Sequence, residues 1–265
     1  MQNPRFLVAK SISYSGLVNY EHCPRYYENV NLKLLKPDKN SPDMAFGTLI
    51  HKYTQDVLEG KLEALIASVK FTKTWNRFDK FYKLDKKYKD FSLIGEKIIL
   101  YIQAFFKKEF GNFKVRHIEF KIEKPIENFP QFFKGYIDIV LELENGKIVI
   151  IDLKTSNSFY SFEEYRDKIK DYQLTLYKKY YSELHNLKLE DISTYFIVFE
   201  KKLESKKPIN IIEIGSSNKK VENAEAWLNQ SLRTINNGKF MKKLTSCRKY
   251  GDKHICTFYR TPNCP

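Results

Sequence analysis

The sequence lacks any apolar run that approaches the ~20 residues a membrane-spanning helix requires. Its first residues lack the apolar core of a signal peptide. No Gly-x-x-x-x-Gly-Lys-Ser/Thr loop occurs, so we expect no ATP-driven motor in this chain. Cysteine is scarce, with only four in the chain. Together these absences predict a cytoplasmic protein without a membrane partner, in which disulfides would be unusual.

Acidic residues are scarcer than basic ones. The 265 residues include 46 Lys and Arg but only 32 Asp and Glu, which gives a formal net charge of +14 and a pI near 9.3. Such an excess attracts polyanions and suits a nucleic-acid partner, although a lysine-rich coding bias can produce part of it. The hydrophobic share of 42% predicts a folded chain, and the length suits one domain with elaborations.

Two apolar, β-branched runs flank Glu144-Asn145-Gly146, which has the composition of a hairpin turn. A two-residue loop at this turn would leave Asp138 and Asp152 on opposite faces of the sheet. A three-residue loop, with Gly146 in the left-handed conformation, places Asp138 directly across from Asp152, and Lys154 then shares their face. We predict the three-residue loop, because only this register gathers the polar side chains. The two runs are 132–143 and 147–153.

The same register gathers an apolar stripe on the opposite face of the hairpin, fit for burial under helices. Two carboxylates as close as Asp138 and Asp152 repel each other unless a proton or a divalent cation neutralises them. Oxygen ligands of this kind favour magnesium or manganese over zinc. The apolar stripe consists of Ile137, Ile139, Leu141, Leu143, Val149, Ile151 and Leu153.

Gly135-Tyr136-Ile137-Asp138 on one strand, followed by Asp152-Leu153-Lys154 on the next, resembles the PD-(D/E)xK nuclease superfamily, and the flanking residues resemble its RecB-type branch. Asp-x-Lys alone is a weak pattern, and its strength here comes from four further matches in the chain. The resemblance implies an α/β fold of the restriction-endonuclease type, with a mixed central sheet flanked by helices. We expect a single nuclease domain over residues 1–265.

One further match opens the chain. Hydroxyl residues around Ser13 are suited to cap a short helix, which the sequence then breaks at Cys23-Pro24. This resembles the RecB-type opening, in which a helix ends in Cys-Pro-Arg and an aromatic residue. Taken alone, Cys23 would more often be a small buried hydrophobe than a ligand.

A second match lies in the next predicted helix, which begins at Ser41-Pro42-Asp43 and runs to Leu58. Its apolar stripe leaves His51 at the edge. Taken alone, such a histidine is usually a packing residue. However, Gly47 and His51 match the Gly-x-x-x-His motif of the RecB-type branch, which implies that His51 joins the metal site.

Residues 61–110 carry apolar residues and lysines at helical spacing, and we expect a helical insertion that covers the cleft. Its aromatic side chains could stack on bases between basic residues, but aromatic residues more often belong to the core. The following run, 115–122, alternates as a strand with Glu119 on the face shared with Val115. A glutamate here lies near the metals in many relatives, which makes Glu119 a candidate. A solvated carboxylate is the alternative.

Ser161-Phe162-Glu163-Glu164 has the form of a capping box and predicts a helix to about Leu184. On this helix, Gln173 and Tyr177 are four residues apart and share a face. Gln-x-x-x-Tyr after Asp-x-Lys is a further RecB-type signature, which implies that the pair lies beside the active site. Further elements are strands over 194–199, expected to be parallel to 147–153, and over 209–214, then a helix over 221–236.

The cysteines are one near the start and three in the tail, 239–265, namely Cys23, Cys247, Cys256 and Cys264. Thiolates bind iron–sulfur clusters or zinc in fours. This layout resembles AddB-type helicase-nucleases and CRISPR-associated adaptation nucleases, which implies a 4Fe–4S cluster, although the family usually spaces the last three more tightly. Zinc is the rival, with His22 or His254 as substitute ligands. Either metal would join the tail to Cys23 and contribute folding energy.

The resemblance implies metal-dependent hydrolysis of DNA. His51, Asp138, Asp152 and the carbonyl of Leu153 would hold one or two Mg²⁺ or Mn²⁺ ions. Lys154 would orient water or stabilise charge on phosphorus. Gln173 and Tyr177 would position the substrate strand or the lysine.

The expected activity is exonucleolytic, on DNA with a free end, in recombination or end processing of a phage, mobile element or CRISPR-type system. A helicase or recombination partner would supply any motor. Two alternatives stay open from the sequence: a non-catalytic nucleic-acid-binding module, and a sequence-specific endonuclease of the restriction type.

Overall fold

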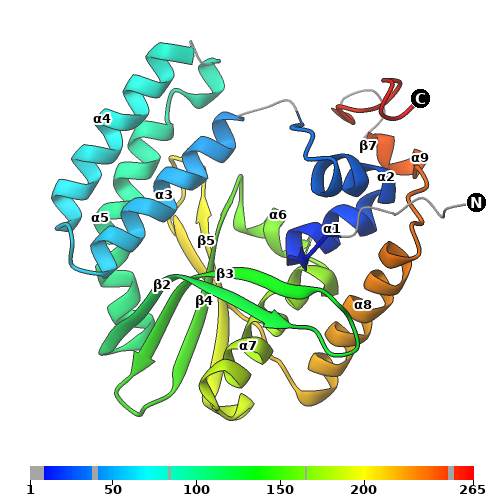
Figure 1. Cartoon of the computed structure of the whole chain (residues 1–265). Coiled ribbons are helices and arrows are strands. Elements are labelled where there is room, and N and C mark those ends of the chain that lie inside the picture. The colour runs from blue at the N-terminus through cyan, green and yellow to red at the C-terminus, as the bar shows by residue number, and fades with distance from the viewer. Residues whose placement is uncertain (1–8, 38–40, 83–84, 165, 250–253) are drawn as a thin grey trace, which may run out of the picture. The chain divides into compact units, whose positions relative to one another are not determined.

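The computed structural model describes residues 9–37, 41–82, 85–164, 166–249 and 254–265 (Figure 1). Within these ranges, the side chains of residues 82, 87, 248, 249, 254 and 255 lie outside the description, among them that of the candidate ligand His254. The chain divides into two compact units. The larger comprises 40–120 and 136–217, and the smaller comprises 1–39, 121–135 and 218–265.

A mixed β-sheet forms the centre of the fold. The described residues give six strands in the order β1-β3-β4-β5-β6, with β2 also paired to β3. Strands β3 and β4 are antiparallel, β4 and β5 are parallel as predicted, and β5 and β6 are antiparallel. The bounds are β1 Ser11–Ile12, β2 Phe113–Pro125, β3 Phe132–Leu143, β4 Ile148–Ser156, β5 Ile192–Glu200 and β6 Ile209–Glu213.

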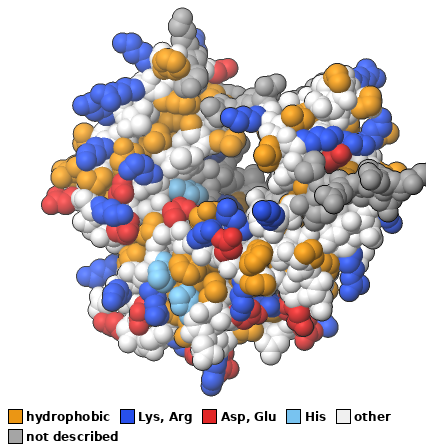
Figure 2. All heavy atoms as spheres, in the orientation of Figure 1, with side chains coloured by type: hydrophobic (Ala, Val, Ile, Leu, Met, Phe, Trp, Pro, Cys, Tyr) orange, Lys and Arg blue, Asp and Glu red, His pale blue; other side chains and the backbone are white. Residues whose placement is uncertain are grey.

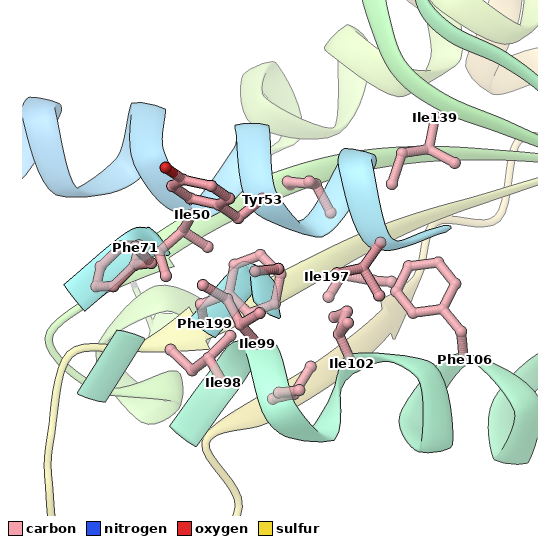
Figure 3. Close-up of a cluster of buried hydrophobic side chains, with 14 of the residues drawn as sticks. Ile50, Tyr53, Phe71, Ile98, Ile99, Ile102, Phe106, Ile139, Ile197 and Phe199 are labelled. Carbon is pink, nitrogen blue, oxygen red and sulfur yellow. The ribbon is translucent and has the colours of Figure 1, made fainter. Parts of the chain in front are cut away.

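Helices of the larger unit cover both faces of its strands. One apolar cluster joins α3, α4 and α5 to the predicted stripe on β3 and β4 and to Ile197 on β5 (Figure 3). Phe196 points to the opposite face because side chains alternate along a strand, and its ring lies 5.7 Å from that of Phe162 on α6. This confirms the predicted α/β class. The bounds are α3 Pro42–Leu58, α4 Ala64–Tyr82, α5 Phe91–Phe110, α6 Phe159–Glu164 and α7 Lys168–His185.

Helix α3 spans the predicted residues. Ser41 precedes it in an extended conformation, Pro42 occupies its first turn with Asp43, and the chain leaves it before Gly60, whose φ is +73°. Proline fits the first turn because its missing N–H has no partner there anyway. The predicted apolar stripe of α3 packs against the sheet. This packing fixes the orientation of the helix and therefore the direction in which His51, at the edge of the stripe, points.

The described part of the segment 61–110 is mainly helical, as predicted. Helices α4 and α5 pack closely because Gly95 on α5 faces Phe71 on α4, where an added Cβ would lie 2.0 Å from the ring. Trp75 is 1% exposed and belongs to the core. Tyr101 is 57% exposed, so not every aromatic side chain of the segment is a packing residue.

The hairpin has the predicted three-residue loop. The Leu143 N–H donates to the Lys147 carbonyl, and the Gly146 N–H donates to the Leu143 carbonyl, both at 2.9 Å. Gly146 has a φ of +78°. Ile139 pairs with Ile151, which is the register that a left-handed glycine at the third loop position produces.

Two expectations about local structure are wrong. The single helix over 161–184 is two helices, because Asp167 takes an extended conformation and caps α7 by accepting a hydrogen bond from the Lys170 N–H. Strand β2 is longer than predicted and does not alternate throughout. Val115 and Ile118 both pack against the core, and Glu119 has a left-handed φ of +50°. Glu119 therefore does not share the face of Val115.

The smaller unit is built from segments far apart in the sequence. The Ser13 side chain caps α1, and the helix stops before Cys23-Pro24, as predicted. Tyr20 donates a hydrogen bond to the Lys239 carbonyl at 2.9 Å. Its helices are α1 Tyr14–His22, α2 Pro24–Tyr27, α8 Asn218–Asn236 and α9 Leu244–Cys247, with a π-helical turn Glu28–Leu32 and a ribbon of β7 Arg248–Lys249 and β8 His254–Ile255.

Replacing Gly146 by alanine should destabilise the protein by about 1 kcal/mol, because an L-residue pays for the left-handed conformation. Nothing lies within 4 Å of the added Cβ, so no clash adds to this cost. Gly146→Asn should cost less, and Gly215→Ala, which is equally open but has no positive φ, serves as the matched control. Urea unfolding measures all three. Equal stability of the Gly146→Ala and Gly215→Ala variants would contradict the assigned loop.

Candidate active site

Asp138 and Asp152 lie on adjacent strands of the larger unit. The pairing of Ile139 with Ile151, continued by one residue, sets Asp138 across from Asp152. The Leu153 N–H donates a hydrogen bond to Asp138 Oδ2 at 2.6 Å. The side chains are 14% and 4% exposed, respectively. Two carboxyl groups are thus held next to each other with little access to water.

Lys154 and Gln173 enclose the Asp152 carboxylate. Lys154 Nζ lies 2.6 Å from Asp152 Oδ2 and donates to Gln173 Oε1 at 3.1 Å. Gln173 Nε2, from α7, donates to Asp152 Oδ1 at 2.7 Å and lies 3.5 Å from the Tyr177 hydroxyl. The three side chains form a closed ring of interactions, with Tyr177 at its side. The spacing Gln-x-x-x-Tyr therefore places Gln173 against Asp152 and Lys154, with Tyr177 next to it.

His51 reaches the same centre from α3. Its Nδ1 lies 3.7 Å from Asp138 Oδ2, the same oxygen that accepts the hydrogen bond of the Leu153 N–H. All six residues that the sequence singles out for the catalytic centre, together with the Leu153 backbone, meet in one place.

Gln55 belongs to this centre and was missed in the sequence. It is buried on α3, one turn after His51. Its Nε2 donates to Glu119 Oε1 at 2.6 Å and to the Asp138 carbonyl at 3.3 Å. The available signal was its spacing, since residues four apart share a helix face. Through Gln55 the exposed Glu119 is held beside the Asp138 backbone.

The electrostatics of the centre follow from burial and like charge. Burial and the nearby Asp152 raise the pKa of Asp138 well above its usual range. Burial alone would lower the pKa of Lys154, but the charge and hydrogen bond of Asp152 outweigh this and raise it. Burial lowers the pKa of His51 despite the opposing effect of Asp152. The imidazole is therefore neutral at pH 7, which is the form that binds metal.

The four cysteines gather in the smaller unit. All are free thiols, and Cys23, Cys247 and Cys264 are buried. Burial first, and then the other thiols, raise the pKa of Cys247 and of Cys264. The Lys243 N–H points at Cys23 Sγ at 3.4 Å, and the Cys256 N–H donates to the Cys247 carbonyl at 3.0 Å. The chain thus places its first cysteine beside the three in the tail.

As these side chains stand, no three His, Cys, Asp or Glu residues of the described segments converge closely enough to hold a metal ion. At Asp152 the reason is visible, since Lys154 and Gln173 occupy its two oxygens. None of the described helices is long and apolar enough to cross a membrane.

The mixed sheet carries two acidic side chains and a lysine on adjacent strands. This is the arrangement expected of the nuclease superfamily that the sequence motifs resemble. Residues 11–257 match the model of the PD-(D/E)XK nuclease superfamily, and the chain belongs to this superfamily. No curated protein sequence matches it significantly.

Among solved structures, the chain resembles a protein from Eubacterium rectale described as a "putative exonuclease". The two are 17% identical, with a TM-score of 0.56 over 90% of this chain and 86% of the other, which shows a shared fold. A second structure, SSO0001, is 16% identical over 72% of this chain and 86% of the other. Its TM-score of 0.34 supports no argument about fold.

Asp138→Asn should make the metal-free protein more stable at neutral pH. The folded-state pKa of Asp138 is raised, so its stabilising effect is complete below the unfolded pKa of about 4 and is lost as the pH rises through the folded pKa. Thermal melts in EDTA from acid to neutral pH should show wild type falling below the variant, with the two converging in acid. Glu142→Gln, which removes a more exposed acid from the same strand, is the matched control for the loss of one carboxylate. Parallel curves for wild type and Asp138→Asn would contradict the raised pKa.

Proposed function

We propose that this chain is a metal-dependent deoxyribonuclease of the RecB-type branch that degrades DNA from free ends. The observation that carries the proposal is the arrangement of Asp138, Asp152 and Lys154 around the Leu153 backbone, with His51 beside it. This arrangement supplies two acids, a base-form imidazole and a fixed positive charge at one point. Membership in a nuclease superfamily supports the same conclusion.

The donor set fits a hard divalent cation. Asp138 and Asp152 offer carboxylate oxygens, the Leu153 carbonyl offers a third oxygen, and His51 offers a neutral nitrogen, which suits Mg²⁺ or Mn²⁺. The raised pKa of Asp138 records the cost of charging this carboxyl without a cation. Bound there, the ion would polarise a phosphate oxygen and lower the pKa of a water molecule.

In this proposal, Lys154 stabilises charge in the transition state, and its neighbours position the lysine. With its pKa raised, Lys154 stays protonated and can stabilise the charge that develops on phosphorus. Gln173 supports the lysine by accepting its hydrogen bond while it donates to Asp152. Tyr177, whose hydroxyl lies 3.5 Å from Gln173 Nε2, would help to hold Gln173 in this position. Of the two roles expected for Gln173, positioning the lysine is the one its contacts support.

The preference for DNA rests on charge. The net charge of +14 attracts a polyanion, and Figure 2 shows Lys and Arg side chains gathered over α4. We infer end-directed action in recombination or DNA end processing, with a separate helicase or recombination protein as motor. A restriction-type endonuclease and a non-catalytic binding module are the outcomes that the next experiment separates.

Asp152→Asn and Asp138→Ala should each reduce DNA degradation about 100-fold or more, because each removes a ligand or charge needed in the transition state. The assay follows linear and circular DNA, single- and double-stranded, with Mg²⁺ or Mn²⁺ and with EDTA. Linear DNA should disappear and circular DNA should persist. Glu142→Gln, an acid on the same strand and the same face, should keep the wild-type rate.

Cleavage of circles would replace the exonuclease assignment by an endonuclease. If the protein binds DNA but does not cut it with any metal, the non-catalytic binding module would be the supported alternative. A wild-type rate for Asp138→Ala would remove the catalytic assignment itself.

We propose further that Cys23, Cys247, Cys256 and Cys264 hold a 4Fe–4S cluster, with zinc as the rival. Four free, mostly buried thiols in one unit are the donor set that both metals take. Hydrogen bonds already link the segments that carry them, including Ser246 to the His22 carbonyl at 2.6 Å. The metal would stabilise the smaller unit by tying its first segment to its last.

Protein purified without oxygen should be brown, with a broad band near ~400 nm, as thiolate-bound iron–sulfur clusters are. Cys23→Ser should lose the colour, lower the iron content and reduce the melting temperature. Colourless protein that contains one zinc per chain would show that the cysteines bind zinc instead of an iron–sulfur cluster. Protein with neither metal, and with an unchanged melting temperature in Cys23→Ser, would overturn the proposal.

A further inference from the structure

A hollow of about 400 Å³ lies between α5 and the segment that leads into β6, within the larger unit. It contains none of the residues of the candidate active site. Its volume is within the range of ligand sites in proteins, about 300 to 1,000 Å³, and near the lower end, where a single nucleotide fits. The lining residues that matter here are Lys97, Tyr101, Phe105, Lys108, Lys206 and Ile209.

The charge of this groove selects an anion. Three lysines line it and no acidic residue does. Lys97 is held in place, since its Nζ donates to the carbonyl of Ser205 at 2.9 Å and lies 3.4 Å from that of Leu203. Lys108 is partly compensated by Glu109 at 3.5 Å, outside the lining. A fixed ammonium group with two further lysines nearby is suited to phosphate.

The aromatic residues select a flat ligand. Tyr101 exposes 57% of its surface, although most aromatic side chains of the same helical segment are buried in the core or packed against it. Phe105 follows it by one helical turn and is half-buried. An exposed ring beside lysines is the combination on which bases of single strands stack. In a duplex, the bases are stacked on each other and cannot enter such a groove.

The sheet register relates the groove to the catalytic strand. Thr155, the residue after Lys154, pairs with Phe199 on β5, and Phe199 pairs with Ile209 on β6. Adjacent strands lie about 4.8 Å apart, so Ile209 is roughly 10 Å across the sheet from Thr155. Because Phe199 and Ile209 are buried, a nucleic-acid strand would have to pass around the edge of the sheet to reach both the groove and the catalytic strand.

We infer that this groove binds a base and phosphate of single-stranded DNA at a distance from the cleavage position. The inference rests on the proposed function and deepens it, because it makes the substrate a single strand or a frayed end. Tyr101 stacks on the base, and Lys97 and Lys206 neutralise the adjacent phosphates.

Fluorescence anisotropy with labelled oligothymidylate of about 12 nucleotides, in EDTA so that nothing is cut, tests this directly. Tyr101→Ala should weaken binding about tenfold, the size expected for loss of one stacked base, whereas Tyr101→Phe should bind as wild type does. Lys206→Gln should reduce the slope of log Kd against log salt by about 0.7. Leu100→Ala, the neighbouring exposed position outside the groove, is the matched control.

A blunt hairpin duplex should bind equally to wild type and Tyr101→Ala. The inference is overturned if Tyr101→Ala binds the oligonucleotide as wild type does, if Tyr101→Phe or Leu100→Ala is as weak as Tyr101→Ala, or if duplex binding falls in parallel. Wild-type protein that binds the single strand through Tyr101 but never cuts it in either Mg²⁺ or Mn²⁺ would refute the nuclease activity and leave the groove assignment standing.

Discussion

The structure depends on holding two like charges together. Asp138 and Asp152 are largely withdrawn from water on neighbouring strands, and burial together with the nearby Asp152 raises the pKa of Asp138. Folding supplies one compensating charge from Lys154, two residues along the same strand as Asp152. A buried charge is tolerated only when it is paired and hydrogen-bonded. The elements around the sheet can be understood as the groups that make this pairing possible.

Both faces of the sheet contribute to it. Helix α3 brings His51 and Gln55 to the Asp138 side, and α7 brings Gln173 to the Asp152 side. Each helix is fixed by an apolar stripe rather than by its polar groups, so the polar side chains do not have to find their partners unaided. The centre is therefore positioned by apolar packing, because burying many apolar side chains contributes more free energy than the few hydrogen bonds within the centre.

The sequence predicted correctly those features that interactions between neighbouring residues determine. The hairpin register follows from one glycine, and α3 follows from Ser41-Pro42 and an apolar stripe. The errors arose where two local signals competed. Asp167 caps a helix more effectively than the capping box at Ser161 extends one, and the left-handed Glu119 interrupts an alternating strand. Gln55 could not be ranked from sequence because its partners come from two different strands, and only the assembled sheet brings them within reach.

The smaller unit combines three stretches of chain, and this has a consequence for how the protein is made. Tyr20 finds its acceptor 219 positions later, at Lys239. A ribosome adding 5–20 residues per second needs roughly 10–45 s to cover that interval. Throughout this time the contacts of α1 with the C-terminal segments cannot form, although β1 can already pair with Phe132 and Phe133 on β3 and the larger unit can assemble. Nascent chains therefore carry exposed apolar helix surface for most of translation, which makes that segment a natural client for chaperones.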